Sequence, residues 1–109
     1  GNKQMTIEFD KKDWKDTKVR ARTLGVKYLV FKDRGLVIAY KPALPSDPRG
    51  KMIEVSVAWC AGDDKFKKKH GKYIAASKLL WLGEYIQLPI NQISECTVQQ
   101  ILSDMFVDF

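Results

Sequence analysis

The sequence lacks most of the residues on which catalysis and metal binding depend. It contains one histidine, His70, and two cysteines, Cys60 and Cys96, that lie far apart in the chain. Structural zinc sites use four ligands in closely spaced pairs. Neither of the two glycine-rich phosphate-binding motifs, G-x-x-x-x-G-K-[ST] and G-x-G-x-x-G, occurs. We therefore expect no catalytic residue, no bound metal and no cofactor, and we expect the protein not to be an enzyme. Catalysis would need a cleft and an orienting partner around His70.

Long hydrophobic runs are absent as well. No apolar stretch approaches the ~20 residues that a membrane-spanning helix requires, and no secretory leader is recognisable. We expect a soluble, cytoplasmic protein that has no membrane partner. Both cysteines are then expected to be reduced, and one disulfide between them is the alternative. Because Gly1 is not an initiator residue, residues 1–4 are expected to be non-native or disordered.

Acidic residues are few relative to basic ones. Among 109 residues the sequence has 19 lysines and arginines against 13 aspartates and glutamates, which gives a net charge of +6. The length fits a single domain over residues 1–109, as a monomer or a homodimer. The excess of positive charge favours an acidic macromolecule as the partner, either a nucleic acid or an acidic protein surface.

The most distinctive feature present is a lysine-rich amphipathic stretch, residues 63–82, which predicts a helix. Asp63 and Asp64 suit its N-cap and first turn, and Gly83 suits its C-terminal stop. The side expected to face the core carries Phe66, His70, Tyr73, Ser77 and Leu80. The side expected to face outward carries Lys68, Gly71, Lys72, Ala75 and Leu79.

The outward side of this helix is the expected contact surface for an acidic partner. Its small residues would allow close approach, and Leu79 would add an apolar contact. The alternative is that the lysines only solvate a surface helix. The residues expected at the contact are Lys65, Lys67, Lys68, Lys69, Lys72, Lys78 and Leu79.

The segment before this helix alternates between apolar and polar residues and predicts strands. Thr6–Phe9 is expected to form a short strand and Thr17–Leu24 a second one. The outer face of the second would add Lys18, Arg20 and Arg22 to the contact surface. Between the two strands we expect a polar turn, in which Trp14 either covers the core or projects as an exposed anchor for the partner.

The remaining apolar segments complete an α+β fold, with an antiparallel sheet of four or five strands, the long helix on one face and a short C-terminal helix. We expect a hairpin of residues 26–32 and 36–41 around Gly35. Further extended segments are expected at residues 52–60 and 84–90. Thr97 and Gln100 fit a capping box for a final helix over residues 98–107, whose apolar face either closes the core or mediates self-association.

The central stretch resembles a segment shared by small tailed-phage proteins. The shared pattern is D-x-F-x-K-K-x-G-[RK]-x-I-A, and residues 64–75 of this chain match it. Residues 9–16, with the pattern F-D-x-K-D-W-K-D, also look like the opening of such proteins. The resemblance implies a phage accessory protein, a class that often serves host takeover or counter-defence. If a phage encodes the protein, we expect it in the cytoplasm of the host cell.

The same stretch also resembles the last helix of double-stranded RNA-binding domains. That helix opens with K-K-x-x-K-x-x-A-A, to which Lys68, Lys69, Lys72, Ala75 and Ala76 correspond. Such domains recognise the RNA duplex by its shape and its phosphates. Two elements of that family have no expected counterpart here, namely its first helix and a Gly-Pro-x-His loop between its first two strands.

Two functions follow as expectations. The first is a non-enzymatic phage-type accessory protein that binds and inhibits a host or defence protein, as anti-CRISPR and anti-restriction proteins do. The alternative is direct binding of nucleic acid through the lysine-rich helix. The two differ in salt dependence, because contacts to phosphates weaken steeply and log-linearly as salt rises.

Overall fold

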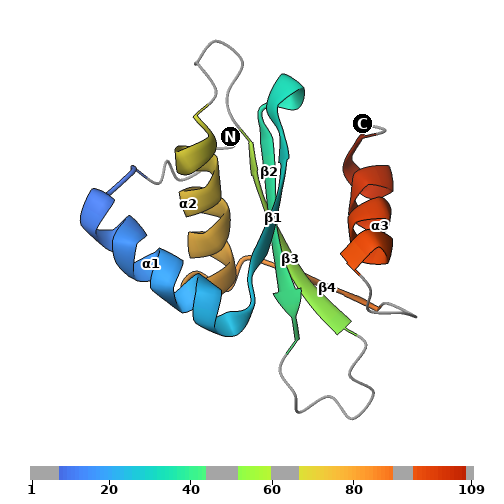
Figure 1. The fold of residues 1–109 in the computed structure, drawn as a ribbon, viewed down its shortest axis with the longest axis horizontal. Coiled ribbons are helices and arrows are strands. Elements are labelled where there is room, and N and C mark those ends of the chain that lie inside the picture. Colours follow the sequence, from blue (N-terminus) through green and yellow to red (C-terminus); the bar gives the residue numbers. More distant parts are fainter. Residues whose placement is uncertain (1–7, 44–51, 60–66, 90–94, 108–109) are drawn as a thin grey trace.

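The computed structural model describes residues 8–43, 52–59, 67–89 and 95–107 of the chain, which form an α+β fold (Figure 1). Along the chain these elements are helix α1 (Lys11–Leu24), strand β1 (Lys27–Phe31), the short 3-10 helix η1 (Lys32–Arg34), strands β2 (Leu36–Pro42) and β3 (Met52–Trp59), helix α2 (Lys68–Leu80), strand β4 (Ile86–Pro89) and helix α3 (Glu95–Val107). The expected fold class is confirmed. None of the helices in these ranges is long and apolar enough to cross a membrane.

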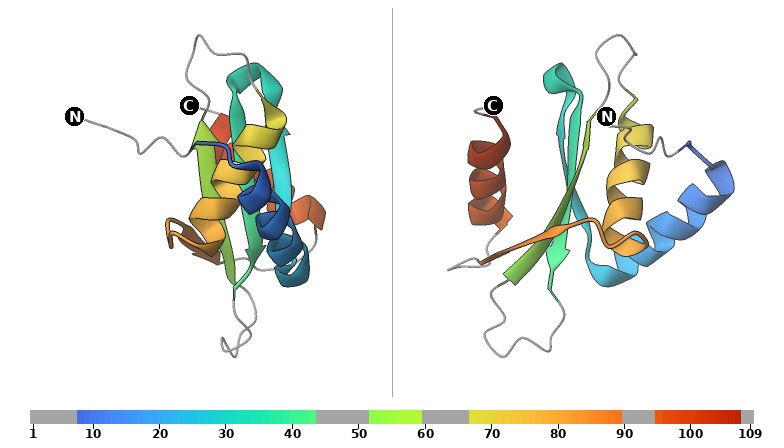
Figure 2. Two further views of the ribbon diagram at one scale, coloured as in Figure 1. Left: turned by 90° about the vertical axis from the view of Figure 1, so that its left-hand side faces the viewer. Right: turned by 180° about the vertical axis from the view of Figure 1, so that it is seen from behind.

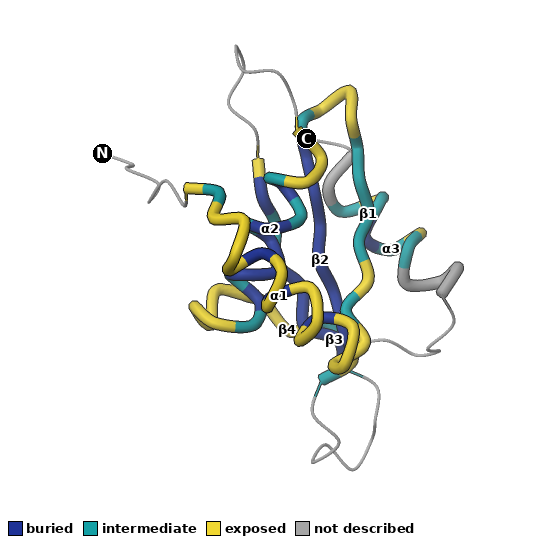
Figure 3. The backbone as a smooth tube through the Cα atoms, turned by 60° about the vertical axis from the view of Figure 1, so that its left-hand side comes forward, coloured by how far each residue is buried: buried dark blue, intermediate teal, exposed yellow. Residues whose placement is uncertain are grey.

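The four strands form one antiparallel sheet in the order β1-β2-β3-β4. Figures 1 and 2 show α1 and α2 on one face of this sheet and α3 on the other. Because β2 and β3 are central and covered on both faces, they are buried along nearly their whole length (Figure 3). Burial on both faces explains why most positions of the two strands are apolar, and their polar residues Lys41, Glu54 and Ser56 are buried as well.

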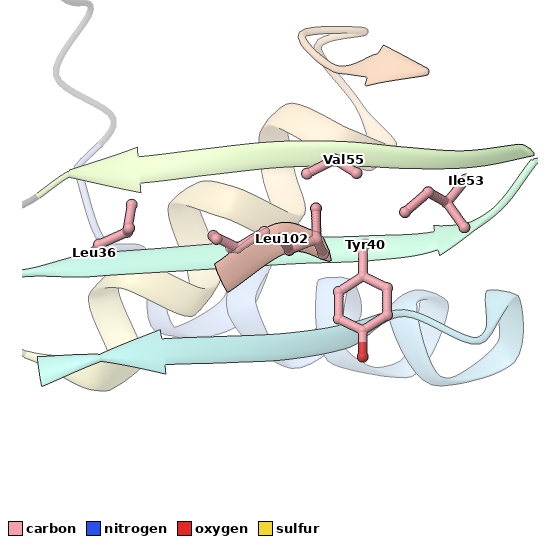
Figure 4. Packing of buried hydrophobic residues seen from close by; sticks show 6 residues of the cluster. Leu36, Tyr40, Ile53, Val55 and Leu102 are labelled. Carbon is pink, nitrogen blue, oxygen red and sulfur yellow. The ribbon is translucent and has the colours of Figure 1, made fainter. Parts of the chain in front are cut away.

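Each face of the sheet carries its own hydrophobic cluster. Leu102 of α3 packs against the alternate side chains of β2 and β3 that point its way, as Figure 4 shows. These side chains are Leu36, Ile38, Tyr40, Ile53 and Val55. On the opposite face Ala75 and Leu79 of α2 pack against Val37, Ala39 and Ala58. Leu102 is fully buried, so α3 closes the core, as one of the two alternatives expected.

The expected hairpin is confirmed. Lys27 lies opposite Tyr40 and Phe31 opposite Leu36, and the chain reverses through η1. Gly35 has a φ of 61°, a left-handed conformation that glycine adopts without steric cost. The expected strand over residues 52–60 is confirmed as β3, except that Cys60 lies outside the described residues.

The expected strand Thr17–Leu24 is wrong, because these residues form the second half of α1. Asp10 is the N-cap and its carboxylate accepts hydrogen bonds from the backbone N–H groups of Lys12 and Asp13. Gly25 ends the helix with a φ of 77°, and the backbone N–H of Val26 donates to the carbonyl of Ala21. Both ends are therefore fixed locally.

The expected polar turn before residue 17 is also wrong, since α1 begins at Lys11. Trp14, Thr17 and Ala21 are the buried residues of α1, and their spacing of three and four positions is that of a helix. Trp14 therefore covers the core and is not an exposed anchor. Of the expected first strand, Glu8 and Phe9 are not in a strand, while residues 6 and 7 lie outside the described ranges.

Helix α2 is confirmed from Lys68 to Leu80, but its beginning and its faces differ from those expected. It starts at Lys68, and residues 63 and 64 lie outside the described residues. Gly71, Ala75 and Leu79, expected on the outer side, are buried. The reason is that α2 lies between the sheet and α1, so that one side packs on β2 and β3 and the other packs Tyr73 and Ala76 on Trp14.

The last two expected elements are confirmed with shifted boundaries. Strand β4 pairs with β3 over only four residues, from Ile86 opposite Val55 to Pro89 opposite Met52. Helix α3 starts at Glu95, so Thr97 lies inside it and not at its N-cap. Gly83 has a φ of 65° and follows α2 by three residues, as the expected stop signal implies.

Candidate functional site

The expected contact residues of α2 divide into exposed and buried groups. Lys67, Lys68 and Lys69 are exposed at the N-terminal end of the helix, and Lys72 is half-buried one turn later. Lys65 lies outside the described residues. Leu79 is only 3% exposed and contacts the sheet, so the expected apolar contact to a partner is wrong.

Lys78 belongs to the structure of the fold and not to its free surface. Its Nζ donates a hydrogen bond of 3.1 Å to the backbone carbonyl of Val57 in β3. Strand β4 pairs with β3 only as far as Val55, so the ammonium group reaches the part of β3 beyond that pairing. This hydrogen bond ties the C-terminal part of α2 to the sheet.

The N-terminal end of α2 is electrostatically unfavourable. Helix N-termini carry a partial positive charge and favour acidic residues, but the first turn of α2 contains none, and Lys67 at the N-cap position makes no side-chain capping hydrogen bond. Three successive lysines stand there instead. Burial and the nearby charge of Lys68 both lower the pKa of Lys72. The helix therefore begins with three successive exposed lysines and no acidic residue in its first turn.

Lys72 lies against an aromatic ring of the neighbouring strand. Its Nζ is 5.1 Å from the centroid of the Tyr28 ring, a distance that suits a cation–π contact. The Tyr28 hydroxyl oxygen is buried without a hydrogen-bond partner among the described residues, and burial raises the pKa of this tyrosine. The contact holds the charge of Lys72 close to β1.

The expected ladder of Lys18, Arg20 and Arg22 does not form, because residues two apart on a helix point in different directions. Lys18 lies over Trp14, with Nζ 5.4 Å from the ring centroid, whereas Arg20 lies over Trp81 at 5.6 Å. A different row exists on α1. Its members are spaced by four, three and four positions, which places them on one side, and all are exposed: Lys11, Lys15, Lys18 and Arg22.

Lys11 and Lys15 were missed because they fell in the segment expected to be a turn. The signals that could have revealed the helix are Asp10 at its N-cap and Gly25 just after its last residue. A helix predicted between Asp10 and Gly25 would have placed the four cations of the α1 row on one side.

Polar contacts hold the two cation-bearing helices together. The Tyr73 hydroxyl of α2 donates to Asp13 Oδ2 of α1 at 2.6 Å, and Trp81 Nε1 donates to Thr17 Oγ1 at 3.1 Å. The His70 ring stacks on Phe9 with ring centroids 4.5 Å apart. Burial and the hydrogen bond to Asp13 together raise the pKa of Tyr73 to about 12. The row of cations on α1 and the lysines at the start of α2 are therefore carried by two helices that are fixed relative to each other.

The turn between β1 and β2 adds further positive charge at the end of the sheet where α2 begins. Figures 1 and 2 show η1 and the N-terminal end of α2 at the same end of the sheet. Lys32 and Arg34 of η1 are exposed. We call the row of four cations on α1, the two cations of η1 and the three lysines at the start of α2 the basic surface, namely Lys11, Lys15, Lys18, Arg22, Lys32, Arg34, Lys67, Lys68 and Lys69.

Comparisons with known proteins give no further guide to this surface. The chain matches no protein-family model, no curated protein sequence and no solved structure. The described residues also hold no group of three or more histidine, cysteine, aspartate or glutamate side chains that could bind a metal ion.

Proposed function

We propose that the protein binds nucleic acid, and that its basic surface contacts the phosphate backbone. The observation that carries the proposal is the arrangement of exposed cations on α1, η1 and the N-terminal end of α2, the two long helices being fixed relative to each other by hydrogen bonds. Rows of lysine and arginine on a rigid frame are what backbone recognition uses.

The unfavourable start of α2 supports a bound anion. Lysines at a helix N-terminus oppose the helix dipole and repel one another, which lowers stability unless a negative ligand is present. A phosphate near Lys68 would accept hydrogen bonds from the lysine side chains and from the free N–H groups of the first turn. A single bound phosphate would thus offset both the repulsion between the lysines and their unfavourable interaction with the helix dipole.

The rival function, inhibition of a host or defence protein by a phage-type accessory protein, is less well supported by this surface. Stable protein interfaces depend on an apolar centre surrounded by polar contacts. The two residues expected to supply such a centre, Leu79 and Trp14, are both buried inside the protein. The basic surface that remains is suited to phosphates.

Two elements of the double-stranded RNA-binding domains had no expected counterpart in this chain, namely the first helix and the Gly-Pro-x-His loop. Helix α1 precedes the strands, so the first helix expected to be missing is present. No solved structure matches the chain, however. The proposal therefore depends on the basic surface alone, and the choice among duplex RNA, duplex DNA and single strands is left to the experiment.

The test is the salt dependence of binding to short DNA and RNA duplexes and to the corresponding single strands, measured by fluorescence anisotropy between about 50 and 200 mM salt. The affinity is expected to fall log-linearly. Lys68→Gln and Lys69→Gln should each lower the slope by about 0.9 for each duplex phosphate that the variant no longer neutralises. Gln87→Glu on the exposed strand β4 changes the net charge equally and is the matched control.

The results separate the alternatives. Equal losses in Lys68→Gln and Gln87→Glu would show that only net charge matters, and absence of binding at the lower salt concentration would refute the proposal. His70→Ala, which leaves every lysine in place, is expected to bind as the wild type does.

A further inference from the structure

An exposed tryptophan stands at the end of the sheet that carries η1. Three large aromatic side chains are exposed among the described residues. Two of them, Trp81 and Tyr85, follow the C-terminal end of α2, whereas Trp59 is the last residue of β3 and is 49% exposed. Tryptophan is well buried on average, and it is enriched at interfaces. Trp59 is therefore a candidate contact residue for a ligand.

The strand register places Trp59 beside η1. Trp59 lies opposite Leu36 of β2, and Leu36 lies opposite Phe31 of β1. The chain between Phe31 and Leu36 consists of η1 and Gly35. Opposite residues have Cα atoms about 4.5–5.5 Å apart, and two residues span at most about 7 Å, so the Cα atoms of Arg34 and Trp59 are within about 13 Å of each other. One ligand can reach both side chains across that distance.

The Trp59 ring is exposed where the neighbouring strand stops short of it. Side chains alternate along a strand, so Trp59 shares the α3 face of the sheet with Val55 and Val57, which pack in the cluster of that face. Strand β4 pairs with β3 only from Met52 to Val55, so it does not border Trp59. Helix α2 covers the other face, and η1 closes the hairpin at the end of the sheet (Figures 1 and 2). The part of the basic surface beside Trp59 is therefore η1.

Trp59 differs from the other aromatic residues that lie close to cations. Cations of the protein itself lie over the rings of Trp14, Tyr28 and Trp81. Trp14 is in addition buried, and Trp81 donates a hydrogen bond to Thr17. Within the described ranges no cation and no second ring lies against Trp59. Its ring face is therefore available to a ligand.

We propose that Trp59 stacks on an unpaired base of a single-stranded nucleic acid whose neighbouring phosphates contact Lys32 and Arg34 of η1. Proteins that hold single strands combine cations that follow the backbone with aromatic side chains on which bases stack. Both cations are exposed, and Asp33 is the one carboxylate of η1. In a duplex the base faces are already stacked on one another, so Trp59 selects unpaired bases. The inference rests on the proposed nucleic-acid binding and names the class of nucleic acid.

The first experiment compares three ligands by fluorescence anisotropy at one salt concentration. They are a single strand, the same strand with abasic positions, which keeps its phosphates, and the blunt duplex. The wild type should bind the normal strand about 5- to 100-fold more tightly than the abasic strand, the range of one base–aromatic stack. Trp59→Ala should remove this difference and leave binding of the abasic strand and the duplex unchanged. Tyr85→Ala, at an exposed aromatic beyond the other end of α2, is the matched control.

The second experiment observes the stacking itself through tryptophan fluorescence. Addition of the normal single strand should quench part of the emission of the wild type, and addition of the abasic strand should quench it less. Trp59→Phe keeps a ring on which a base can stack, so it should retain most of the affinity and lose most of the quenching. Circular dichroism melting curves show whether each variant remains folded. The comparison of normal and abasic strands uses the wild type and needs no variant.

The outcomes separate this inference from the proposed function. Equal binding of normal and abasic strands by the wild type would overturn the stacking and leave the phosphate contacts in place. A folded Trp59→Ala that binds the normal strand as the wild type does, or a Tyr85→Ala that loses as much affinity as Trp59→Ala, would overturn it as well. Absence of binding to all three ligands at about 50 mM salt would refute the proposed function and the inference together.

Discussion

The buried ion pair between β2 and β3 offers the sharpest test of the sheet. Lys41 and Glu54 lie opposite each other in the strand register, and Lys41 Nζ is 2.8 Å from Glu54 Oε1. The two residues are 7% and 6% exposed. Lys41 Nζ also donates to the carbonyl of Pro42 at 3.2 Å. Removing one partner leaves the other charge buried without compensation.

The expected loss of stability follows from leaving the remaining charge of the pair buried and desolvated. Lys41→Met should lower the free energy of unfolding by about 3–5 kcal/mol, since breaking a buried pair from one side has this cost. A small domain has only about 5–15 kcal/mol in total. The double variant Lys41→Met, Glu54→Leu removes both charges together and should recover most of the loss or even exceed wild-type stability.

Urea denaturation followed by circular dichroism measures each free energy of unfolding, and the wild type, the two single variants and the double variant form a double-mutant cycle. Lys68→Met, at an exposed lysine, is the control and should change stability by less than about 0.5 kcal/mol. The reasoning is refuted if Lys41→Met costs under about 1 kcal/mol, or if the two single effects simply add in the double variant.

Two further predictions concern the helices. Because the pKa of Tyr73 is raised to about 12 from an ordinary value of 10.0, folding should lose stability as the pH rises from about 10 to about 12, by at most about 1.4 kcal/mol per pH unit. In Tyr73→Phe, the free energy of unfolding, measured by urea denaturation at each pH, should fall less steeply over this pH range. An unchanged dependence on pH would contradict the raised pKa of Tyr73. Leu79→Ala should lower the free energy of unfolding, measured by urea denaturation, by about 2–5 kcal/mol because Leu79 is buried. Ile86→Ala, at an exposed position, should lower it far less. Equal losses in the two variants would place Leu79 on the surface.

The strands could be predicted from the sequence because their signals are local. Residues 26–41 form two apolar runs around a glycine, which specifies a hairpin by itself, and the structure pairs them as expected. Residues 52–59 place Ile53, Val55, Val57 and Trp59 on one face and alternate them with Glu54, Ser56 and Ala58, which is the period of a strand. The helical period of residues 98–107 likewise predicted α3.

Helix α1 could not be predicted from alternation alone. Val19, Ala21 and Thr23 alternate with basic residues as in a strand, yet Val19 is 65% exposed and Ala21 is buried. The buried stripe of this helix is only Trp14, Thr17 and Ala21, too sparse to show a helical period clearly. The caps at Asp10 and Gly25 were the better signal, because they act on the ends of the helix and not on its faces.

The basic surface was predicted in part. The lysines at residues 67–69 are exposed as expected, because a run of charged side chains has no place inside a core. Leu79 was assigned to the wrong side because the period of α2 does not reveal that both of its sides are covered. The carboxylates expected at its N-terminus precede the helix by several residues, which left the lysines themselves in the first turn.

The sequence by itself determined the fold class, the central hairpin, the positions of α2 and α3, and the excess of positive charge, since each depends on composition or on residues close together in the chain. Only the tertiary structure decided that Lys11, Lys15, Lys18 and Arg22 share one exposed side of α1, that α2 is covered on both sides by the sheet and by α1, and that Trp81, Leu82, Tyr85 and Ile86 remain exposed. These features depend on the packing of segments far apart in sequence. Burial is a property of that packing, and no local pattern specifies it.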